Sequence, residues 1–236
     1  MNRRIRRKVS LAICAILLLC ATAVGAIVKH SNRLFTTGAA EMPPTLVIDA
    51  GHGGIDGGAI SDDGTKESDI NLAIALRLDS IVRFCGQKTL MTRLDDIPKT
   101  DILGYSEHED LKSRVDIANS ATNAVLVSIH QNYYPTAQPK GAQVLYSAFG
   151  DSERLGRLMQ NTLGGKLDPD NRRLAVPAPR ELYLTANTRC PAVLVECGFM
   201  SNNFEVLKLK ENGYQNALAL VIAASYLEYI SDRSSM

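Results

Sequence analysis

A short apolar run followed by a glycine-dense loop most constrains how this chain can fold. The stretch reads Leu46-Val-Ile-Asp-Ala-Gly-His-Gly-Gly-Ile-Asp-Gly-Gly58 and carries His52 at the mouth of the loop. The apolar run is typical of a buried strand, and the glycines indicate backbone that turns sharply or approaches another group closely. The design recurs at Ala124-Val-Leu-Val-Ser-Ile-His130 and at Ala192-Val-Leu-Val-Glu-Cys-Gly198. Three apolar strands therefore each end beside a residue that can bind a metal ion or move a proton.

Helical patterns alternate with these strands. Glu67 to Phe84 repeats apolar residues at 3.6 spacing, which predicts a helix that begins on a carboxylate pointing toward the sheet. Further helices are expected at 111–121, 152–163 and 213–230, strands at 88–93 and 141–147, and loops at 95–110 and 164–181. The alternation, with no internal repeat, predicts one doubly wound α/β domain at residues 45–232. Its sheet is expected to be mostly parallel, twisted and flanked by helices.

The carboxyl ends of parallel strands gather at one edge of a sheet, where ligands bind. We expect His52, His130 and Glu196 to meet at that edge, with Glu67 facing it from a helix N-terminus. Two histidines and a carboxylate are a standard set of ligands for catalytic zinc, with a fourth position left for water. His52, Glu67 and His130 fit that set. The pattern alone leaves open that both histidines are ordinary hydrogen-bonded polar groups.

Glu196 ends the apolar run Val193-Leu-Val-Glu196. A carboxylate at that place is costly to bury unless a charge or a hydrogen-bond donor meets it. One interpretation is that Glu196 moves protons beside a bound cation without ligating it. The other is a structural ion pair with an arginine such as Arg93 or Arg189.

Nucleotides and nucleic acids are poor candidates for the ligand. The glycine loop comes close to a dinucleotide-binding turn, but the segment 61–66 separates its glycines from the helix that would have to open directly on the phosphates. No Gly-Lys-Ser/Thr sequence is present either. Six of the 26 basic residues precede residue 30, so the rest of the chain carries 20 basic against 25 acidic residues. A folded part with that balance argues against a nucleic-acid binder.

The N-terminal segment has the pattern of an export signal. Residues 1–8 are basic, and residues 9–28 form an uncharged, mostly apolar run without the polar stripe of a soluble helix. We favour an uncleaved membrane anchor at 1–28 because twenty residues can span a bilayer. Small-residue sites at Ala21-Thr-Ala23 and Val24-Gly-Ala26 leave a cleaved signal peptide as the alternative. In either case a linker at 29–44 connects the segment to a domain outside the cytoplasm.

The cysteines indicate neither a disulfide framework nor a zinc ribbon. Three of the five follow the apolar segment, and no CxxC pair occurs. A bridge between Cys190 and Cys197 is an alternative outside the cytosol, but buried free thiols are the favoured interpretation.

Four motifs taken together resemble the zinc-dependent N-acetylmuramoyl-L-alanine amidases of bacterial cell walls. They are Val47-Ile-Asp-Ala-Gly-His-Gly-Gly54, Lys66-Glu-Ser68, Ser128-Ile-His-Gln-Asn132 and Val195-Glu-Cys-Gly-Phe-Met-Ser-Asn202. Each motif is short, and their order and spacing over residues 45–230 make the resemblance specific. The family usually has proline where this chain has Ala50, and a small residue where it has Tyr133. Neither departure replaces a ligand, so they concern the shape of the cleft.

The resemblance implies that Zn²⁺ is held by His52, Glu67 and His130, with Glu196 as the catalytic glutamate. It implies hydrolysis of the amide between the lactyl group of N-acetylmuramic acid and L-alanine in peptidoglycan, with zinc-bound water as the nucleophile. Glu196 would act as a base and then as an acid to the departing amine. Asn132 is a candidate for contact with the substrate, although its position suits a strand-end turn equally well.

The short single-domain build resembles the spore-cortex, germination-specific amidases. This resemblance implies action on the cell wall or at the outer face of the membrane, and the spore envelope is one such place. Some division amidases carry a helix that covers the metal, but the segment 133–140 contains two prolines and is too short for a stable one. Control is therefore expected from expression, from location or from a protein activator whose identity the sequence does not give.

Two other functions stay open at this stage. One is a non-catalytic protein that grips peptidoglycan, which would be marked by loss of Glu196 or of a ligand. The other is a zinc peptidase or deacetylase that uses the same four residues on a different bond.

Overall fold

The computed structural model describes residues 43–96 and 105–233. Both the expected signal or anchor at 1–28 and nearly all of the linker at 29–44 fall outside these residues. Within the described residues, no helix has both the length and the hydropathy needed to cross a membrane.

Six strands form one sheet in the order β2-β1-β3-β6-β4-β5. The strands are β1 (Thr45–Ala50), β2 (Thr89–Met91), β3 (Ala124–Asn132), β4 (Gln143–Tyr146), β5 (Val176–Pro177) and β6 (Ala192–Phe199). The first four in spatial order are parallel, whereas β4 runs antiparallel to β6. The mostly parallel α/β sheet expected from the sequence is confirmed. The parallel block brings the ends of β1, β3 and β6 to one edge of the sheet.

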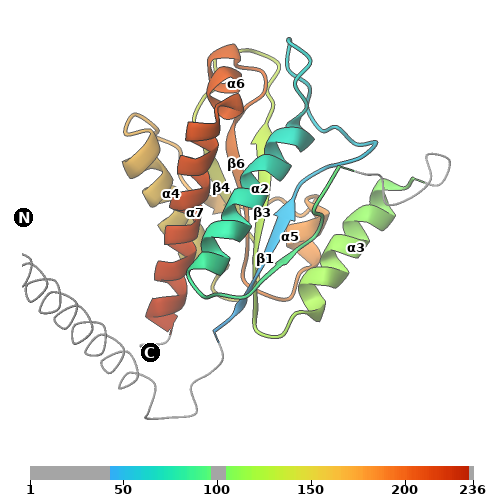
Figure 1. Cartoon of the computed structure of the whole chain (residues 1–236), viewed down its shortest axis with the longest axis vertical. Coiled ribbons are helices and arrows are strands. Elements are labelled where there is room, and N and C mark those ends of the chain that lie inside the picture. The colour runs from blue at the N-terminus through green and yellow to red at the C-terminus, as the bar shows by residue number, and fades with distance from the viewer. Residues whose placement is uncertain (1–42, 97–104, 234–236) are drawn as a thin grey trace, which may run out of the picture. The chain divides into compact units, whose positions relative to one another are not determined.

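Helices cover both faces of the sheet. They are α2 (Glu67–Phe84), α3 (Glu107–Ser120), α4 (Ser152–Leu167), α5 (Tyr183–Asn187), α6 (Asn203–Lys210) and α7 (Asn212–Arg233). Figure 1 shows α2, α7 and α4 side by side on one face, where α7 packs against both of the others. On the other face α3 packs against α5 and β3.

The alternation of side chains along β1 divides the core between these two layers. Leu46, Ile48 and Ala50 belong to the larger apolar cluster, which includes side chains of α2, α4 and α7. Val47 belongs to the smaller cluster, which includes side chains of α3 and α5. Successive strand residues point to opposite faces, so Asp49 lies on the side of Val47, toward α3. The strand is thus held from both sides just before it enters the glycine loop.

Several predicted ends of helices and loops were wrong. At these places local hydrogen bonds, and not the apolar periodicity, determine where an element begins or ends. The helix expected from residue 111 begins at Glu107, because the Ser106 hydroxyl caps it by accepting from the Glu109 amide at 3.4 Å. The expected loop at 95–110 is therefore too long. In the loop expected at 164–181, α4 continues to Leu167 and the short strand β5 is present. The helices α5 and α6 were not predicted.

The cysteines of the folded part are free thiols. Cys197 lies in β6 and belongs to the larger core cluster, whereas Cys190 precedes that strand and belongs to the smaller cluster. About seven residues of extended chain separate the pair by roughly 20 Å, far beyond the span of a disulfide. The alternative of a Cys190–Cys197 bridge is therefore excluded, and the favoured prediction of buried free thiols is confirmed for this pair.

Candidate metal centre and catalytic cleft

The loop after β1 places His52 at the carboxyl edge of the sheet. His52 has a positive φ of 58°, which is uncommon for a residue with a side chain. Two arginines fix the backbone beneath it. Arg114 of α3 donates to the carbonyls of Ala50 and His52, each at 2.8 Å, and Arg93 donates to the carbonyls of Ala50 and Gly51 at 2.8 and 3.1 Å. These contacts hold the conformation that turns the imidazole toward α2.

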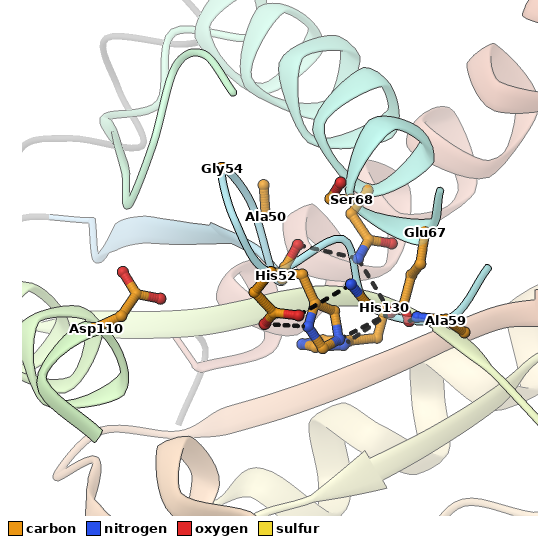
Figure 2. Close-up of polar contacts among 12 residues, drawn as sticks. Ala50, His52, Gly54, Ala59, Glu67, Ser68, Asp110 and His130 are labelled. Carbon is orange, nitrogen blue, oxygen red and sulfur yellow. Dashed lines mark hydrogen bonds and ion pairs between the residues drawn. The ribbon is translucent and has the colours of Figure 1, made fainter. Parts of the chain in front are cut away.

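Three candidate ligands converge at this edge. His52, Glu67 and His130 each offer one ligand atom, and these atoms all lie within 4.8 Å of one another. Glu67 Oε1 lies 3.4 Å from Nε2 of His52 and 3.1 Å from Nδ1 of His130. Figure 2 shows the three side chains pointing toward one another from the loop, the start of α2 and the end of β3. The donor set suits a divalent ion such as zinc, so the residues present fit the metal that the sequence implied.

Glu67 is fixed by backbone and side-chain donors. Its Oε2 accepts from the Ala59 amide at 3.0 Å, and its Oε1 accepts from the Gln131 amide at 2.9 Å and the Asn71 side chain at 3.1 Å. Its place in the first turn of α2 suits a negative charge. The carboxylate is therefore oriented by its surroundings before any ion binds.

The electrostatic field of the cluster favours positive charge. Burial alone would lower the pKa of His52, but hydrogen bonds to Asp56 and Glu67 raise it to about 10. Burial alone would raise the pKa of Glu67, yet its contacts with His130 and His52 hold it well below the ordinary value. A site that stabilises an imidazolium so strongly also stabilises a metal cation in the same field.

Two glycines leave the space that these side chains need. A Cβ on Gly51 would lie 2.2 Å from Nε2 of His130. A Cβ on Gly58, whose φ is 66°, would lie 2.7 Å from both Glu67 Oε2 and a carbon of the His52 ring. The glycine-dense loop thus permits a close approach of backbone to the candidate ligands, as its composition predicted.

Glu196 lies beside His130, its partner in the register of β3 and β6. Its Oε2 atom is buried and has no hydrogen-bond partner. Burial raises the pKa of Glu196 to about 7. The alternative of a structural ion pair is excluded for Arg93, which donates instead to backbone carbonyls and pairs with Asp96. Among the described residues, Oε2 of Glu196 has no partner of any kind, so Arg189 does not pair with it at that atom either. A largely buried carboxylate with an unsatisfied oxygen and a pKa near neutrality has the properties of a proton carrier.

A cleft of about 330 Å³ opens over these groups. Its floor is formed by the candidate ligands and Glu196, and its walls include residues from the start of α3 and from α5. The residues that line the cleft also include Asn132, Tyr133 and Tyr183. An extended substrate can therefore reach the buried carboxylate from solvent.

Comparison with known proteins agrees with this geometry. The family model described as N-acetylmuramoyl-L-alanine amidase matches residues 46–227. The germination-specific N-acetylmuramoyl-L-alanine amidase of Bacillus subtilis is 32% identical over 196 residues, which cover 80% of each chain. The chain belongs to the N-acetylmuramoyl-L-alanine amidase family.

Solved structures of amidases share the fold. The CwlD amidase from Clostridioides difficile, in complex with the GerS lipoprotein, superposes with a TM-score of 0.75 and 35% identity, covering 80% of this chain and 98% of that one. The amidase AmiC2 of Nostoc punctiforme gives a TM-score of 0.69 and 30% identity, covering 81% of this chain and 99% of that one. The resemblance to spore-cortex amidases stated from the sequence is confirmed.

In this amidase Asn132 ends β3 after a break in the register with β6. Its backbone carbonyl accepts from the Met200 amide at 2.7 Å, and the residue lines the cleft. Both sequence interpretations of Asn132, a strand end and a residue facing substrate, are therefore compatible with its position. The segment 133–140 that follows contains no helix, as its length and prolines predicted.

Sequence reasoning missed the residues that support the candidate ligands. Asp56 lies 2.6 Å from the His52 ring, and Asp49 forms an ion pair with Arg114 at 2.9 Å. Asp56 stands four residues after His52 in the same glycine loop, which is a local signal that could have been used. Nothing in the sequence around Arg114 indicates its contact with a loop some sixty residues earlier.

Proposed function

We propose that this amidase is a zinc enzyme that hydrolyses the amide bond between the lactyl group of N-acetylmuramic acid and L-alanine in peptidoglycan. His52, Glu67 and His130 would hold the ion, because their ligand atoms already lie within 4.8 Å of one another. Zinc bound there would supply a Lewis acid that polarises a carbonyl and increases the acidity of water at neutral pH.

The observation that carries the proposal is the buried, unpartnered Oε2 of Glu196 beside these ligands. Glu196 takes a proton from water at that atom and delivers it to the departing amine of L-alanine. A carboxylate of ordinary pKa would be a weak base and would hold a proton too briefly to deliver it. Burial raises the pKa of Glu196 to about 7 and so fits it to both roles near neutrality.

Asn132 is the proposed contact to the substrate. Its backbone is fixed by the Met200 amide, so its side chain starts from an ordered position in the wall of the cleft. An amide side chain both donates and accepts, which suits the peptide groups on either side of the scissile bond. Tyr133, exposed beside it, would contact the outer part of the substrate.

The spore cortex is the proposed setting. This part of the proposal is supported by the germination-specific relative in Bacillus subtilis and by the Clostridioides difficile amidase. Export by the N-terminal segment would bring the domain to the wall, where a retained anchor would also keep it at the membrane. Because that second relative was solved with a lipoprotein, we include a protein activator of this chain in the proposal.

Digestion of purified peptidoglycan by the full-length protein tests the reaction. We expect new amino termini on L-alanine, and we expect Glu196→Gln to lose activity by about 10²- to 10⁴-fold while it keeps zinc. Glu228→Gln, the same substitution at an exposed position on α7, should leave activity unchanged. An untouched wall would favour a binding protein, new termini on other residues a peptidase, and released acetate a deacetylase. Each of these outcomes would contradict the proposal.

A further inference from the structure

His52 is held through its backbone carbonyl and through its ring, which has a carboxylate at each nitrogen. Its carbonyl accepts from Arg114 at 2.8 Å, which fixes the backbone in the left-handed region. Its Nδ1 lies 2.6 Å from Oδ2 of Asp56, a short contact typical of a hydrogen bond to a carboxylate. The opposite nitrogen, Nε2, lies 3.4 Å from Oε1 of Glu67.

A metal ion that binds one ring nitrogen of a histidine replaces the hydrogen there, so the bound ring is neutral and carries a hydrogen on its other nitrogen only. Because an ionised carboxylate only accepts hydrogen bonds, the contact with Asp56 places that hydrogen on Nδ1. The lone pair is then on Nε2, the nitrogen that faces Glu67. The ring is therefore presented in the tautomer and rotation that a metal ligand requires.

Asp56 is itself fixed within the loop. Its second oxygen, Oδ1, accepts from the Gly58 amide at 3.0 Å, and its backbone exchanges two hydrogen bonds with Gly53 at 2.7 and 3.2 Å. The carboxylate thus uses one oxygen to close the loop and the other to hold the ring. The first role would be served by any residue that stabilises the turn, but the second requires an acceptor at that place.

We propose that Asp56 is a positioning residue that fixes the tautomer and orientation of His52, so that Nε2 is ready to bind the ion. The inference rests on the proposed zinc function, since it concerns how one of the proposed ligands is prepared. Removing such a partner of a ligating histidine usually weakens metal affinity by about 10- to 100-fold.

The structure offers a matched control in Asp96. Its Oδ1 accepts from the Gly54 amide of the same loop at 2.9 Å, and it pairs with Arg93 at 3.4 Å. The side chains of Asp56 and Asp96 are exposed to similar degrees, 32% and 33%. Substituting either one with Asn removes one negative charge and weakens one loop contact. Only the substitution of Asp56 alters the contact with the His52 ring.

The test measures the zinc dissociation constant of metal-free full-length protein by competition with a chromophoric chelator. We expect Asp56→Ala to bind zinc about 10- to 100-fold more weakly. Asp56→Asn should lose less zinc affinity, because its amide oxygen can still accept a hydrogen bond from Nδ1. The zinc affinity of Asp96→Asn should stay close to that of the unchanged protein. The melting temperature of each metal-free variant shows whether a loss of zinc affinity comes from a loss of stability. If Asp56→Ala does not fold, the zinc affinity of Asp56→Asn is compared with that of Asp96→Asn instead.

Wild-type affinity in Asp56→Ala would overturn the inference, as would an equal loss in Asp96→Asn, which would assign the effect to charge alone. Nitrogen chemical shifts of the His52 ring give a second readout. In the zinc-loaded protein, a hydrogen fixed on Nδ1 of the unchanged ring and a mixture of Nδ1- and Nε2-bound rings in Asp56→Ala would support the inference, and identical spectra would contradict it. His52→Ala separates the two proposals. If that variant keeps full zinc affinity, the metal centre itself is wrong, whereas loss there with no loss in Asp56→Ala contradicts only the positioning role.

Discussion

Glu67 Oε1 lies 3.1 Å from Nδ1 of His130, although the two residues are 63 positions apart in the chain. The contact joins the first residue of α2 to the carboxyl end of β3, and His52 completes the cluster from the loop after β1. Because the carboxylate is anchored by backbone amides, it forms the fixed centre about which the two rings are placed.

His130→Ala should lower the zinc content of the purified protein. Loss of one of three ligands leaves an incomplete site for a structural or catalytic zinc. Elemental analysis of protein dialysed against zinc gives the stoichiometry, and treatment with a chelator should abolish the amidase activity of the unchanged protein reversibly. His108→Ala is the control, because that ring lies on α3 against Tyr183 at 5.1 Å and is no part of the ligand cluster. Full zinc content in His130→Ala would remove this residue from the metal centre.

Gly51→Ala should displace the His130 ring. A Cβ at this position would lie 2.2 Å from Nε2, a distance that forces the ring or the loop to move. We expect zinc affinity to fall by at least about tenfold, as expected when support of a ligating histidine is lost. Gly165→Ala is the matched control, because a Cβ there meets nothing within 4 Å and the residue lies in α4. Equal zinc affinities in the two variants would show that the loop adapts without cost.

Glu196→Gln should stabilise the metal-free protein at alkaline pH. The pKa of Glu196 is raised from 4.5 to about 7 by burial, so the folded state binds more protons than the unfolded state between these values. Stability contributed by this group therefore falls as pH rises through that window, and the penalty is complete above about pH 7. Each pKa unit corresponds to about 1.4 kcal/mol, which makes the expected gain on the order of 3 kcal/mol at pH 8.

Urea unfolding at pH 8 and pH 4 measures this gain. The advantage of Glu196→Gln should shrink toward zero at pH 4, where the carboxyl is protonated in both states. Glu228→Gln should change the free energy of unfolding by less than about 0.5 kcal/mol at either pH, as is usual for an exposed position. A destabilised Glu196→Gln at pH 8 would show that the buried carboxylate has a partner.

Asp49→Asn should destabilise the fold by about 3 kcal/mol, because it leaves the buried Arg114 with less compensation. Asp49 accepts from Arg114 at 2.9 Å, from Thr92 at 2.7 Å and from Ser128 at 2.5 Å. Burial alone would raise the pKa of Asp49, but the Arg114 charge, with His130 and the two hydroxyl donors, holds it below 3.8.

The sign of this shift sets the pH dependence. Because the pKa of Asp49 is lower in the folded state than in the unfolded state, its carboxylate stabilises the fold fully above about pH 4. This stabilisation is lost as the pH falls through the pKa that Asp49 has in the folded state. The difference between wild type and Asp49→Asn should therefore narrow below pH 4. Asp116→Asn, which removes an exposed pair with Lys112, should cost less than about 0.5 kcal/mol throughout. Equal effects of the two substitutions would contradict a buried structural role for Asp49.

The sequence by itself determined the elements that carry strong periodicity and the residue types of the site. Apolar runs lead up to Asp49, His130 and Glu196 within β1, β3 and β6, and in parallel βαβ units such strands end at a common edge. Burial on both faces leaves these segments little alternative to a central strand. The residue types of the candidate ligands could also be predicted from the sequence, because whether a side chain can bind a metal ion depends on its chemistry and not on its exact position.

Tertiary structure alone decided how those groups are held. Arg114 and Arg93 reach the loop carbonyls from α3 and from the second residue after β2, contacts that no local pattern encodes. Arg93 does not pair with Glu196 because its guanidinium binds the loop carbonyls and Asp96. The sequence alone could not predict this choice of partner. Ends of helices and short elements such as α5 and α6 also escaped prediction, because single caps and packing contacts set them. Local periodicity fixes which residues face the core, but side chains that meet across sixty residues are placed only when the layers pack.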